Sequence, residues 1–249
     1  MFVKVVIPAL NEERAIAQVI AEIPRGLVDE VVVADNLSTD STAAVAASAG
    51  ATVVSAAPRG YGTACLAGLA YLEGRPHDIV VFLDGDRSDH PEVMPQLLAP
   101  ILAGEADMVI GSRSLGEAEH GALLPQQVFG NWLATTLIAL LMRHRYTDLG
   151  PFRAIRRDAL SALEMRDRDF GWTVEMQVKA VQRGLRVVEV PVPYRRRIGK
   201  SKIAGTVSGT VRAGVKILGT IGRLWVLDVA GGASARRARA PRSPTGRSR

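Results

Sequence analysis

Short, mainly apolar runs alternate with longer stretches of helical periodicity over the first 113 residues of the chain. The runs are rich in β-branched residues and span residues 3–7, 30–34, 52–55, 79–83 and 107–110. Runs of this length without a polar break are typical of strands that are buried on both faces of a parallel sheet. Their alternation with helical stretches predicts right-handed βαβ units, and hence an α/β fold in which helices flank a mostly parallel sheet.

The pattern changes in the second half of the chain. It predicts a polar loop, an apolar helix, a second helix, a strand and a final amphipathic stretch, in that order, at residues 116–121, 126–143, 173–183, 186–192 and 203–225. No internal repeat is visible, and no segment carries the pattern of a second core. We therefore predict a single domain over residues 1–230, followed by a tail at 231–249.

The net charge of +6 is concentrated in that tail. Residues 231–249 contain six arginines and no acid, so the remainder of the chain is formally neutral. A basic tail can contact nucleic acid or anionic lipid, but it is more often a solvated, disordered end. We predict a disordered tail and no nucleic-acid partner.

Cysteine content and hydropathy indicate the cellular compartment in which the protein is expected. Cys65 is the only cysteine, which excludes an internal disulfide and fits a reducing environment. The longest uncharged apolar stretch, Trp132–Met142, has 11 residues, whereas about 20 are needed to span a bilayer. No signal peptide is visible after Met1. The expectation is a cytoplasmic protein that is soluble or lies on the inner face of the cell membrane.

The candidate chemistry begins where the apolar run 79–83 ends. Asp84 and Asp86 follow it, separated by one glycine, and open α/β sheets place their ligands at the carboxyl ends of strands. Two neighbouring carboxylates suit Mg²⁺ or Mn²⁺, although Asp and Gly also favour ordinary turns. Two other predicted strands end in polar residues as well, at Asn11-Glu12-Glu13 and at Asp35. This repetition favours a binding site over an isolated turn.

Six motifs occur in the same order as in family-2 glycosyltransferases, and the chain most resembles the branch of dolichyl- or polyprenyl-phosphate mannosyl- and glucosyltransferases. They are Pro8-Ala9-Leu10-Asn11-Glu12-Glu13, Asp35, Asp84-Gly85-Asp86, Gly111-Ser112-Arg113, Phe152-Arg153 and Gly199-Lys200-Ser201-Lys202. The resemblance covers roughly residues 3–225. It implies a GT-A fold, a divalent cation, a nucleoside diphosphate sugar donor and inversion at the anomeric carbon. It also implies a nucleotide-sugar-binding half at 1–113 and an acceptor-facing half at 114–230.

The resemblance assigns expected roles by position. Positions that hold the nucleoside in such enzymes correspond to Pro8, Ala9, Glu12 and Asp35. Metal-binding positions correspond to Asp84 and Asp86; where relatives often carry a glutamine this chain has Ser88, so Asp89 is a candidate third ligand. Basic positions around the diphosphate and the acceptor phosphate correspond to Arg113, Arg153, Arg196 and Lys202.

The acceptor determines whether a general base is needed. A phosphate acceptor is already ionised and needs cations around it, and the planar guanidinium of arginine pairs bidentately with phosphate. A hydroxyl acceptor needs a base, and Glu175 lies near the position where hydroxyl-transferring relatives hold one. The basic residues favour a polyprenyl phosphate. The two long apolar stretches would then lie in a membrane interface, although such helices commonly pack on a sheet instead. The third hypothesis is a non-catalytic protein that binds nucleotides or serves as a membrane scaffold.

Overall fold

The structure, a computed structural model, describes the backbone of residues 1–199 and 207–239 and the side chains of residues 1–199 and 211–230. A seven-stranded sheet with the strand order β3-β2-β1-β4-β6-β5-β7 forms its centre. The strands are β1 Val3–Ala9, β2 Glu30–Asp35, β3 Thr52–Ser55, β4 Ile79–Phe82, β5 Met108–Ser112, β6 Arg153–Arg156 and β7 Val187–Pro191. All neighbouring pairs are parallel except the two that involve β6. The predicted α/β fold with a mostly parallel sheet is confirmed.

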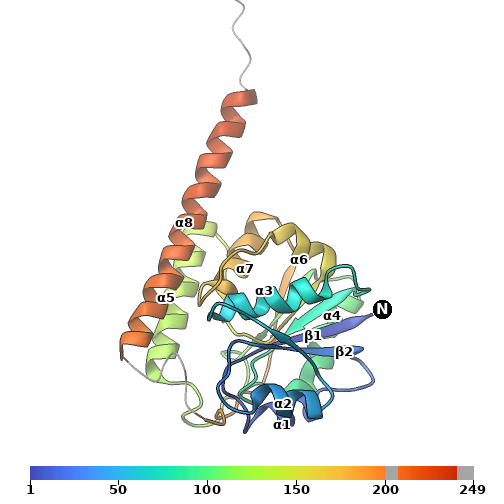
Figure 1. The fold of residues 1–249 in the computed structure, drawn as a ribbon. Coiled ribbons are helices and arrows are strands. Elements are labelled where there is room, and N and C mark those ends of the chain that lie inside the picture. The colour runs from blue at the N-terminus through green and yellow to red at the C-terminus, as the bar shows by residue number, and fades with distance from the viewer. Residues whose placement is uncertain (200–206, 240–249) are drawn as a thin grey trace, which may run out of the picture.

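Helices cover both faces of the sheet (Figure 1). They are α1 Ile16–Glu22, α2 Thr42–Ser48, α3 Tyr61–Leu72, α4 Met94–Leu102, α5 Pro125–Met142, α6 Arg157–Leu163, α7 Trp172–Gln182 and α8 Val207–Arg239, with a 3-10 turn at Pro91–Val93. One core cluster contains residues of α1, α2 and α4, and the other contains residues of α3 and α5 to α8. Along β1, Val5 and Ile7 belong to the first cluster and Val6 to the second, as expected for side chains that alternate across a sheet.

Strand β6 and helix α6 were not predicted from the sequence. The strand reads Arg-Ala-Ile-Arg, so only its two central residues are apolar. It runs antiparallel between β4 and β5 and pairs with both. The second half of the chain therefore completes the sheet that the first half begins.

Two helices have ends that the sequence pattern does not indicate. Helix α1 begins at Ile16, after Ala15, so Asn11 lies outside it. Asn11 adopts a positive φ of 54°, which asparagine tolerates better than most residues. Its Oδ1 accepts a hydrogen bond from the backbone N–H of Thr39 at 2.8 Å, so it joins two loops. At the other end, α8 continues to Arg239, beyond the predicted start of the tail at 231.

Helices α5 and α8 lie side by side, and α8 extends beyond the rest of the fold (Figure 1). Several of their large apolar side chains are exposed, namely Val128, Phe129, Trp132 and Leu140 on α5 and Val211, Val215, Val226, Leu227 and Val229 on α8. Within the described part of the chain, none of the helices has the length and hydropathy needed to cross a membrane.

Candidate active site

A cavity of about 270 Å³ lies where strands β1, β2 and β4 end. Its lining residues come from seven places in the chain: Pro8, Ala9, Leu10 and Glu12; Asn36; Arg59, Gly60, Tyr61 and Ala64; Asp84, Gly85 and Asp86; Asp169 and Phe170; Arg197; and Arg212. Sheet strands thus supply the first wall and the second half of the chain supplies the opposite one. This is the edge at which open α/β sheets bind ligands.

The two aspartates after β4 line this cavity together. Strand geometry ends at Phe82, and Asp84 and Asp86 lie on the loop and turn that follow. The Asp84 Oδ1 atom accepts a hydrogen bond from the Tyr61 hydroxyl at 3.0 Å. The Asp86 Oδ2 atom lies 2.7 Å from Nη1 of Arg197, and its Oδ1 accepts from the backbone N–H of Ser88 at 2.9 Å. Each carboxylate is held by named partners and still contributes to the cavity wall.

Buried negative charge raises the pKa of two acids here. Burial, followed by the charge of Asp86, raises the pKa of Asp84 to about 6. Burial, followed by the charge of Asp84, raises the pKa of Asp89 to about 8. The acids therefore repel one another in the metal-free protein, and any cation placed among them would relieve that repulsion.

The charge balance of the cavity fits a divalent cation. Among the described residues that line it, four carboxylates face three guanidinium groups, a formal balance of 3 − 4 = −1. A nucleoside diphosphate would meet net negative charge there, whereas Mg²⁺ or Mn²⁺ would reverse the sign. Asp84 and Asp86 provide the hard oxygen ligands that these ions prefer. The described residues contain no group of three or more His, Cys, Asp or Glu that could hold a metal alone, so the remaining ligands would come from the substrate and water.

Asp89 is not placed as a third metal ligand. It is 1% exposed and does not line the cavity. Its Oδ2 accepts a hydrogen bond from the backbone N–H of Asp84 at 3.1 Å. Its Oδ1 is buried, with no hydrogen-bond partner in the described structure. Asp89 therefore holds the backbone of Asp84 in place from the protein interior.

The raised pKa of Asp89 makes stability depend on pH. The folded protein holds this proton more tightly than the unfolded chain, so the stabilisation is present below about pH 4 and is lost as the pH rises towards about 8. The raised pKa of Asp84 acts in the same direction. We expect the free energy of unfolding of the EDTA-treated protein to fall on the order of 3 kcal/mol across this window. Urea unfolding at several pH values measures it.

The matched variant for that measurement is Asp89→Asn, which cannot titrate. Its profile should be clearly flatter between pH 4 and pH 8 than that of the wild type. Wild-type and variant profiles of equal slope would contradict the assignment of this pH dependence to Asp89.

The residues predicted to hold the nucleoside are mostly found at the cavity. Pro8, Ala9 and Glu12 line it. Asp35 does not, although it ends β2 beside Ala9 and its buried Oδ1 has no hydrogen-bond partner in the described structure. The next residue, Asn36, lines the cavity instead, and its Oδ1 accepts from the backbone N–H of Gly60 at 2.7 Å.

The predicted basic positions are not gathered at the cavity. Arg113 forms hydrogen bonds of 2.7 Å from both Nε and Nη2 to the carboxylate of Asp148. Arg153 is 0% exposed and donates to the backbone oxygens of Thr173, Leu149 and Gly150. Neither lines the cavity. Both side chains hold the fold together behind the site.

Arg196 was also misplaced. Its backbone N–H donates to Glu119 and its Nε donates to the backbone oxygen of His120 at 2.6 Å, so it holds a loop. Arg197, its neighbour, is the residue that enters the cavity and pairs with Asp86. Adjacent residues of an extended segment point in opposite directions, and the run of three arginines gave no signal as to which one faces the site. Lys202 lies outside the described residues.

Glu175 does not line the cavity. It is 4% exposed and accepts hydrogen bonds from the backbone N–H groups of Arg166 and Asp167 at 3.1 and 2.7 Å. Its Oε1 lies 2.8 Å from Nζ of Lys179. A carboxylate committed to these partners orients the 166–167 segment, and it is not placed to take a proton from an acceptor in the cavity.

The opposite wall was not predicted, and it depends on a close approach between two segments. A Cβ atom on Gly62 would lie 2.1 Å from the backbone oxygen of Asp167, so only glycine fits there. Thr63 N–H donates to the backbone oxygen of Arg168 at 3.0 Å. This contact brings Phe170 and Tyr61 to the same cavity. The Gly-x-Gly pattern at 60–62 is the signal in the sequence that could have indicated this contact.

Comparison with known proteins agrees with this architecture. A family model described as Glycosyl transferase family 2 matches residues 4–163. An uncharacterised glycosyltransferase of Mycobacterium tuberculosis is 39% identical over 216 residues, which cover 85% of this chain and 94% of that protein. The dolichyl-phosphate hexose transferase of Haloferax volcanii is 36% identical over 203 residues, which cover 80% of this chain and 85% of that protein.

A solved structure is similar over most of the chain. It is that of glucosyl-3-phosphoglycerate synthase from Mycobacterium tuberculosis in complex with Mn²⁺, uridine diphosphate and glucosyl-3-phosphoglycerate. The TM-score is 0.72 at 28% sequence identity, and the match covers 90% of this chain and 79% of that one. The expected GT-A fold is thereby confirmed.

Proposed function

The chain belongs to glycosyltransferase family 2, and we propose that it transfers a hexose, with inversion, from a nucleoside diphosphate sugar to a polyprenyl phosphate at the inner face of the cell membrane. One observation carries the proposal: Asp84 and Asp86 follow the inner strand β4 and line one cavity with arginine side chains. That arrangement provides for a metal, a diphosphate and an anionic acceptor at one place.

The residues that would hold Mg²⁺ or Mn²⁺ are Asp84 and Asp86. When bound, the ion stabilises the negative charge that develops on the departing diphosphate. The chain itself supplies three further positive charges, from Arg59, Arg197 and Arg212. The ion pair between Asp86 and Arg197 at 2.7 Å keeps a cation next to this carboxylate in the metal-free protein.

The residues of the cavity support a phosphate acceptor. A phosphate acceptor needs positive charge rather than a base, and guanidinium groups suit phosphate. Support comes from the printed names of relatives, which include a dolichyl-phosphate hexose transferase and an undecaprenyl-phosphate mannosyltransferase. The alternative, a hydroxyl acceptor with Glu175 as base, is less well supported because Glu175 binds the 166–167 segment.

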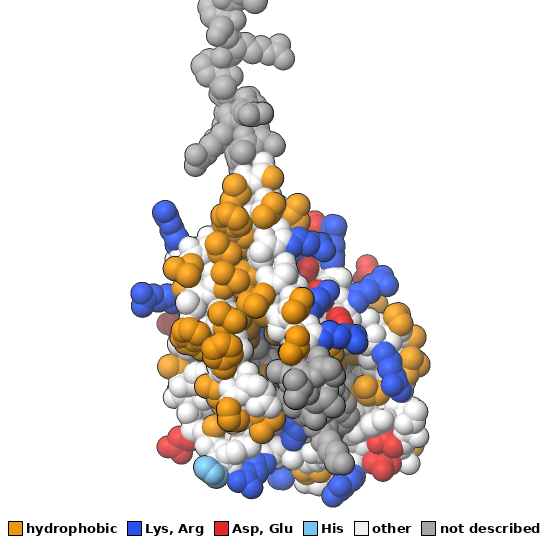
Figure 2. Space-filling model, turned by 90° about the vertical axis from the view of Figure 1, so that its left-hand side faces the viewer, with side chains coloured by type: hydrophobic (Ala, Val, Ile, Leu, Met, Phe, Trp, Pro, Cys, Tyr) orange, Lys and Arg blue, Asp and Glu red, His pale blue; other side chains and the backbone are white. Residues whose placement is uncertain are grey.

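The apolar face of α5 and α8 supports a membrane location for the acceptor. Figure 2 shows hydrophobic side chains gathered along this face, and Phe129 and Trp132 are 60% and 57% exposed. A contiguous apolar surface of this kind marks an interaction site. Arg212 of α8 also lines the cavity that contains Asp84 and Asp86, which we call the donor cavity. A lipid-bound α8 would therefore border the place where transfer occurs.

A panel of nucleotide sugars tests the donor site. We expect one donor to raise the melting temperature when Mn²⁺ is present and to have little effect with EDTA. Ligand at about 100 times its dissociation constant stabilises a protein by roughly 2.7 kcal/mol. The stabilising donor is then used with labelled sugar and a polyprenyl phosphate, and the labelled lipid product is measured. Faster transfer to soluble 3-phosphoglycerate than to the lipid would overturn the proposed acceptor.

Substituting Phe129 and Trp132 together by serine tests the membrane face. Removal of two large apolar side chains from an interface should weaken binding to phosphatidylcholine vesicles by at least about tenfold. The matched control is Phe2→Ser with Leu102→Ser, because both residues are exposed and α4, which ends at Leu102, packs on the other face of the sheet. Vesicle co-sedimentation gives both affinities. Equal losses in the two double variants would contradict a specific membrane face.

A further inference from the structure

A second cavity lies beside α8, separate from the donor cavity. Its volume is about 520 Å³, and segment 166–168 and one side of α8 form much of its wall. Four of its lining residues are basic, namely Arg166, Arg168, Lys216 and Arg223. The donor cavity shares no lining residue with it. The proposed chemistry of sugar transfer therefore makes no use of this second site.

The second cavity carries excess positive charge. Its two acids, Asp167 and Glu175, are paired at 3.0 Å with Lys216 and at 2.8 Å with Lys179. In the part of the chain that the structure describes, neither Arg168 nor Arg223 forms an ion pair with an acid. Both of these arginines are exposed. Two guanidinium groups are thus available at the rim of the cavity for an anion from outside.

The position of this charge on α8 relates it to the membrane face. At 3.6 residues per turn, Lys216 and Arg223 lie about 80 to 100° around the helix from Val215. Val215 and Val226 are exposed, whereas Ile221 and Leu224 face the core. The basic side of α8 therefore lies between its outward apolar side and its buried side. Lys and Arg side chains follow the edge of the apolar surface in Figure 2.

We propose that this cavity binds the phosphate group of an anionic membrane phospholipid, at a site distinct from that of the sugar acceptor. An amphipathic helix that binds a bilayer buries its apolar side about 5–10 Å below the headgroups. That depth places the rim of the cavity among the lipid phosphates. Arg168 and Arg223 then pair with a phosphate in the planar, bidentate manner of guanidinium groups. This inference rests on the membrane contact of the proposed function and names the lipid that α8 selects.

Arg168→Gln combined with Arg223→Gln tests the proposal in the full-length protein. Each basic residue near an anionic membrane surface contributes to the free energy of binding. The loss of two should weaken binding to vesicles containing phosphatidylglycerol roughly 30-fold. Binding to vesicles of phosphatidylcholine alone should change by less than about twofold, because the apolar face is intact. Co-sedimentation with both vesicle types measures the two affinities.

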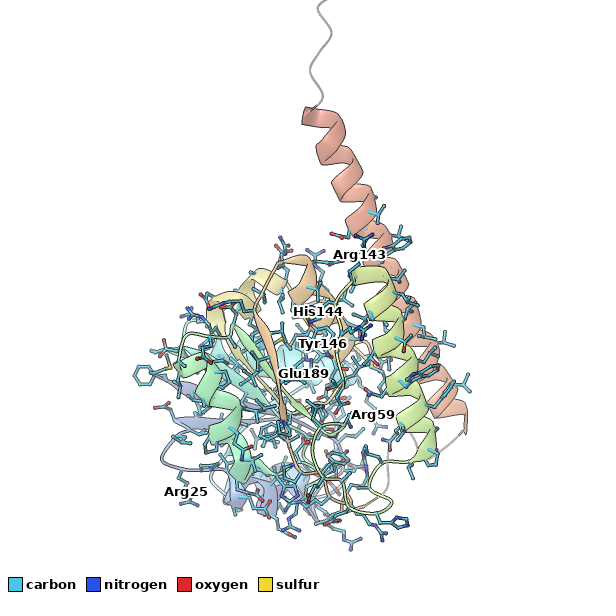
Figure 3. All side chains as sticks on the ribbon, turned by 180° about the vertical axis from the view of Figure 1, so that it is seen from behind. Arg25, Arg59, Arg143, His144, Tyr146 and Glu189 are labelled. Atoms are coloured by element: carbon cyan, nitrogen blue, oxygen red, sulfur yellow. The ribbon has the colours of Figure 1, made fainter. Side chains whose placement is uncertain are left out.

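The matched control is Arg14→Gln combined with Arg25→Gln, which removes the same charge. Both residues flank α1, which packs on the opposite face of the sheet from α8, and Figure 3 shows Arg25 far from α8. This control should lose less than about threefold on phosphatidylglycerol vesicles. Equal losses in the two double variants would show general charge attraction and overturn the site.

Two further measurements test whether the site recognises a guanidinium pair and a lipid phosphate. Arg168→Lys with Arg223→Lys keeps the charge but not the guanidinium planes, and we expect it to bind phosphatidylglycerol vesicles more weakly than the wild type. Inorganic phosphate should not raise the melting temperature; if it does, and the Gln double variant abolishes the effect, the site serves a free phosphate and the lipid assignment is overturned. Donor-induced thermal stabilisation with Mn²⁺ should be unchanged in every variant. If it is absent from the wild type as well, the proposed function fails while the lipid site stands.

Discussion

Replacing Asp86 with alanine should lower the rate of sugar transfer by roughly a thousandfold, the effect of removing a principal electrostatic stabiliser of a developing anion. The carboxylate is 4% exposed, lines the donor cavity and pairs with Arg197 at 2.7 Å. Its loss removes a proposed metal ligand and leaves Arg197 without this partner. Initial rates with labelled donor and polyprenyl phosphate measure the effect. Mn²⁺-dependent thermal stabilisation by the donor should disappear in parallel.

The control for that experiment is Asp158→Ala. Asp158, on α6, is 71% exposed in its side chain and pairs with Arg156 of β6 at 3.1 Å, so the substitution removes one acid without changing the cavity. Its transfer rate should stay within about twofold of the wild type, since exposed ion pairs contribute little. An Asp86→Ala protein that transfers sugar as fast as the Asp158→Ala protein would contradict the role proposed for Asp86 in transfer.

The sequence was informative where burial determines residue type. The inner strand before Asp84 is apolar throughout because both of its faces are covered by helices, and such a pattern is readable without a structure. The acids that follow could therefore be placed at the carboxyl end of an inner strand. Strand β6 could not be found in this way, because Arg153 and Arg156 end a four-residue strand and its pairing partners are distant in sequence.

The basic residues show the opposite case. Arginine can line a cavity, pair with a buried acid or hold a loop, and the sequence does not distinguish these outcomes. Arg197 lines the cavity, Arg113 pairs with Asp148, and Arg196 holds the loop that contains His120. Only tertiary contacts determine which carboxylate or carbonyl lies within reach. Motif position thus led to the run of arginines at 195–197, but the arginine of that run that lines the cavity is Arg197 and not Arg196.

The pairing of Arg113 with Asp148 leads to the second large expected effect, on stability. Asp148 is 1% exposed and accepts hydrogen bonds from the backbone N–H, Nε and Nη2 of Arg113 at 2.7 to 2.8 Å. Burial alone would lower the pKa of Arg113, but the charge of Asp148 raises it overall, so the guanidinium stays charged. Asp148→Ala leaves that charge buried without its acid. The free energy of unfolding should fall by about 3–5 kcal/mol, as for other broken buried pairs.

Urea unfolding of a double variant that lacks both charges distinguishes this cause from a general packing defect. Arg113→Met combined with Asp148→Leu removes both charges and fills similar space, and buried pairs replaced in this way commonly lose little stability. We therefore expect the double variant to be more stable than Asp148→Ala by at least about 2 kcal/mol. If the two variants are equally unstable, the two residues stabilise the fold mainly by packing rather than as an ion pair.

The side chain of Arg113 also lies over the ring of Tyr194, 5.1 Å from its centroid. Tyr194 lies three residues before Arg197, in the segment that reaches the donor cavity. A loss of the pair should consequently reduce transfer even at temperatures where the variant remains folded, because this segment would lose one of its supports.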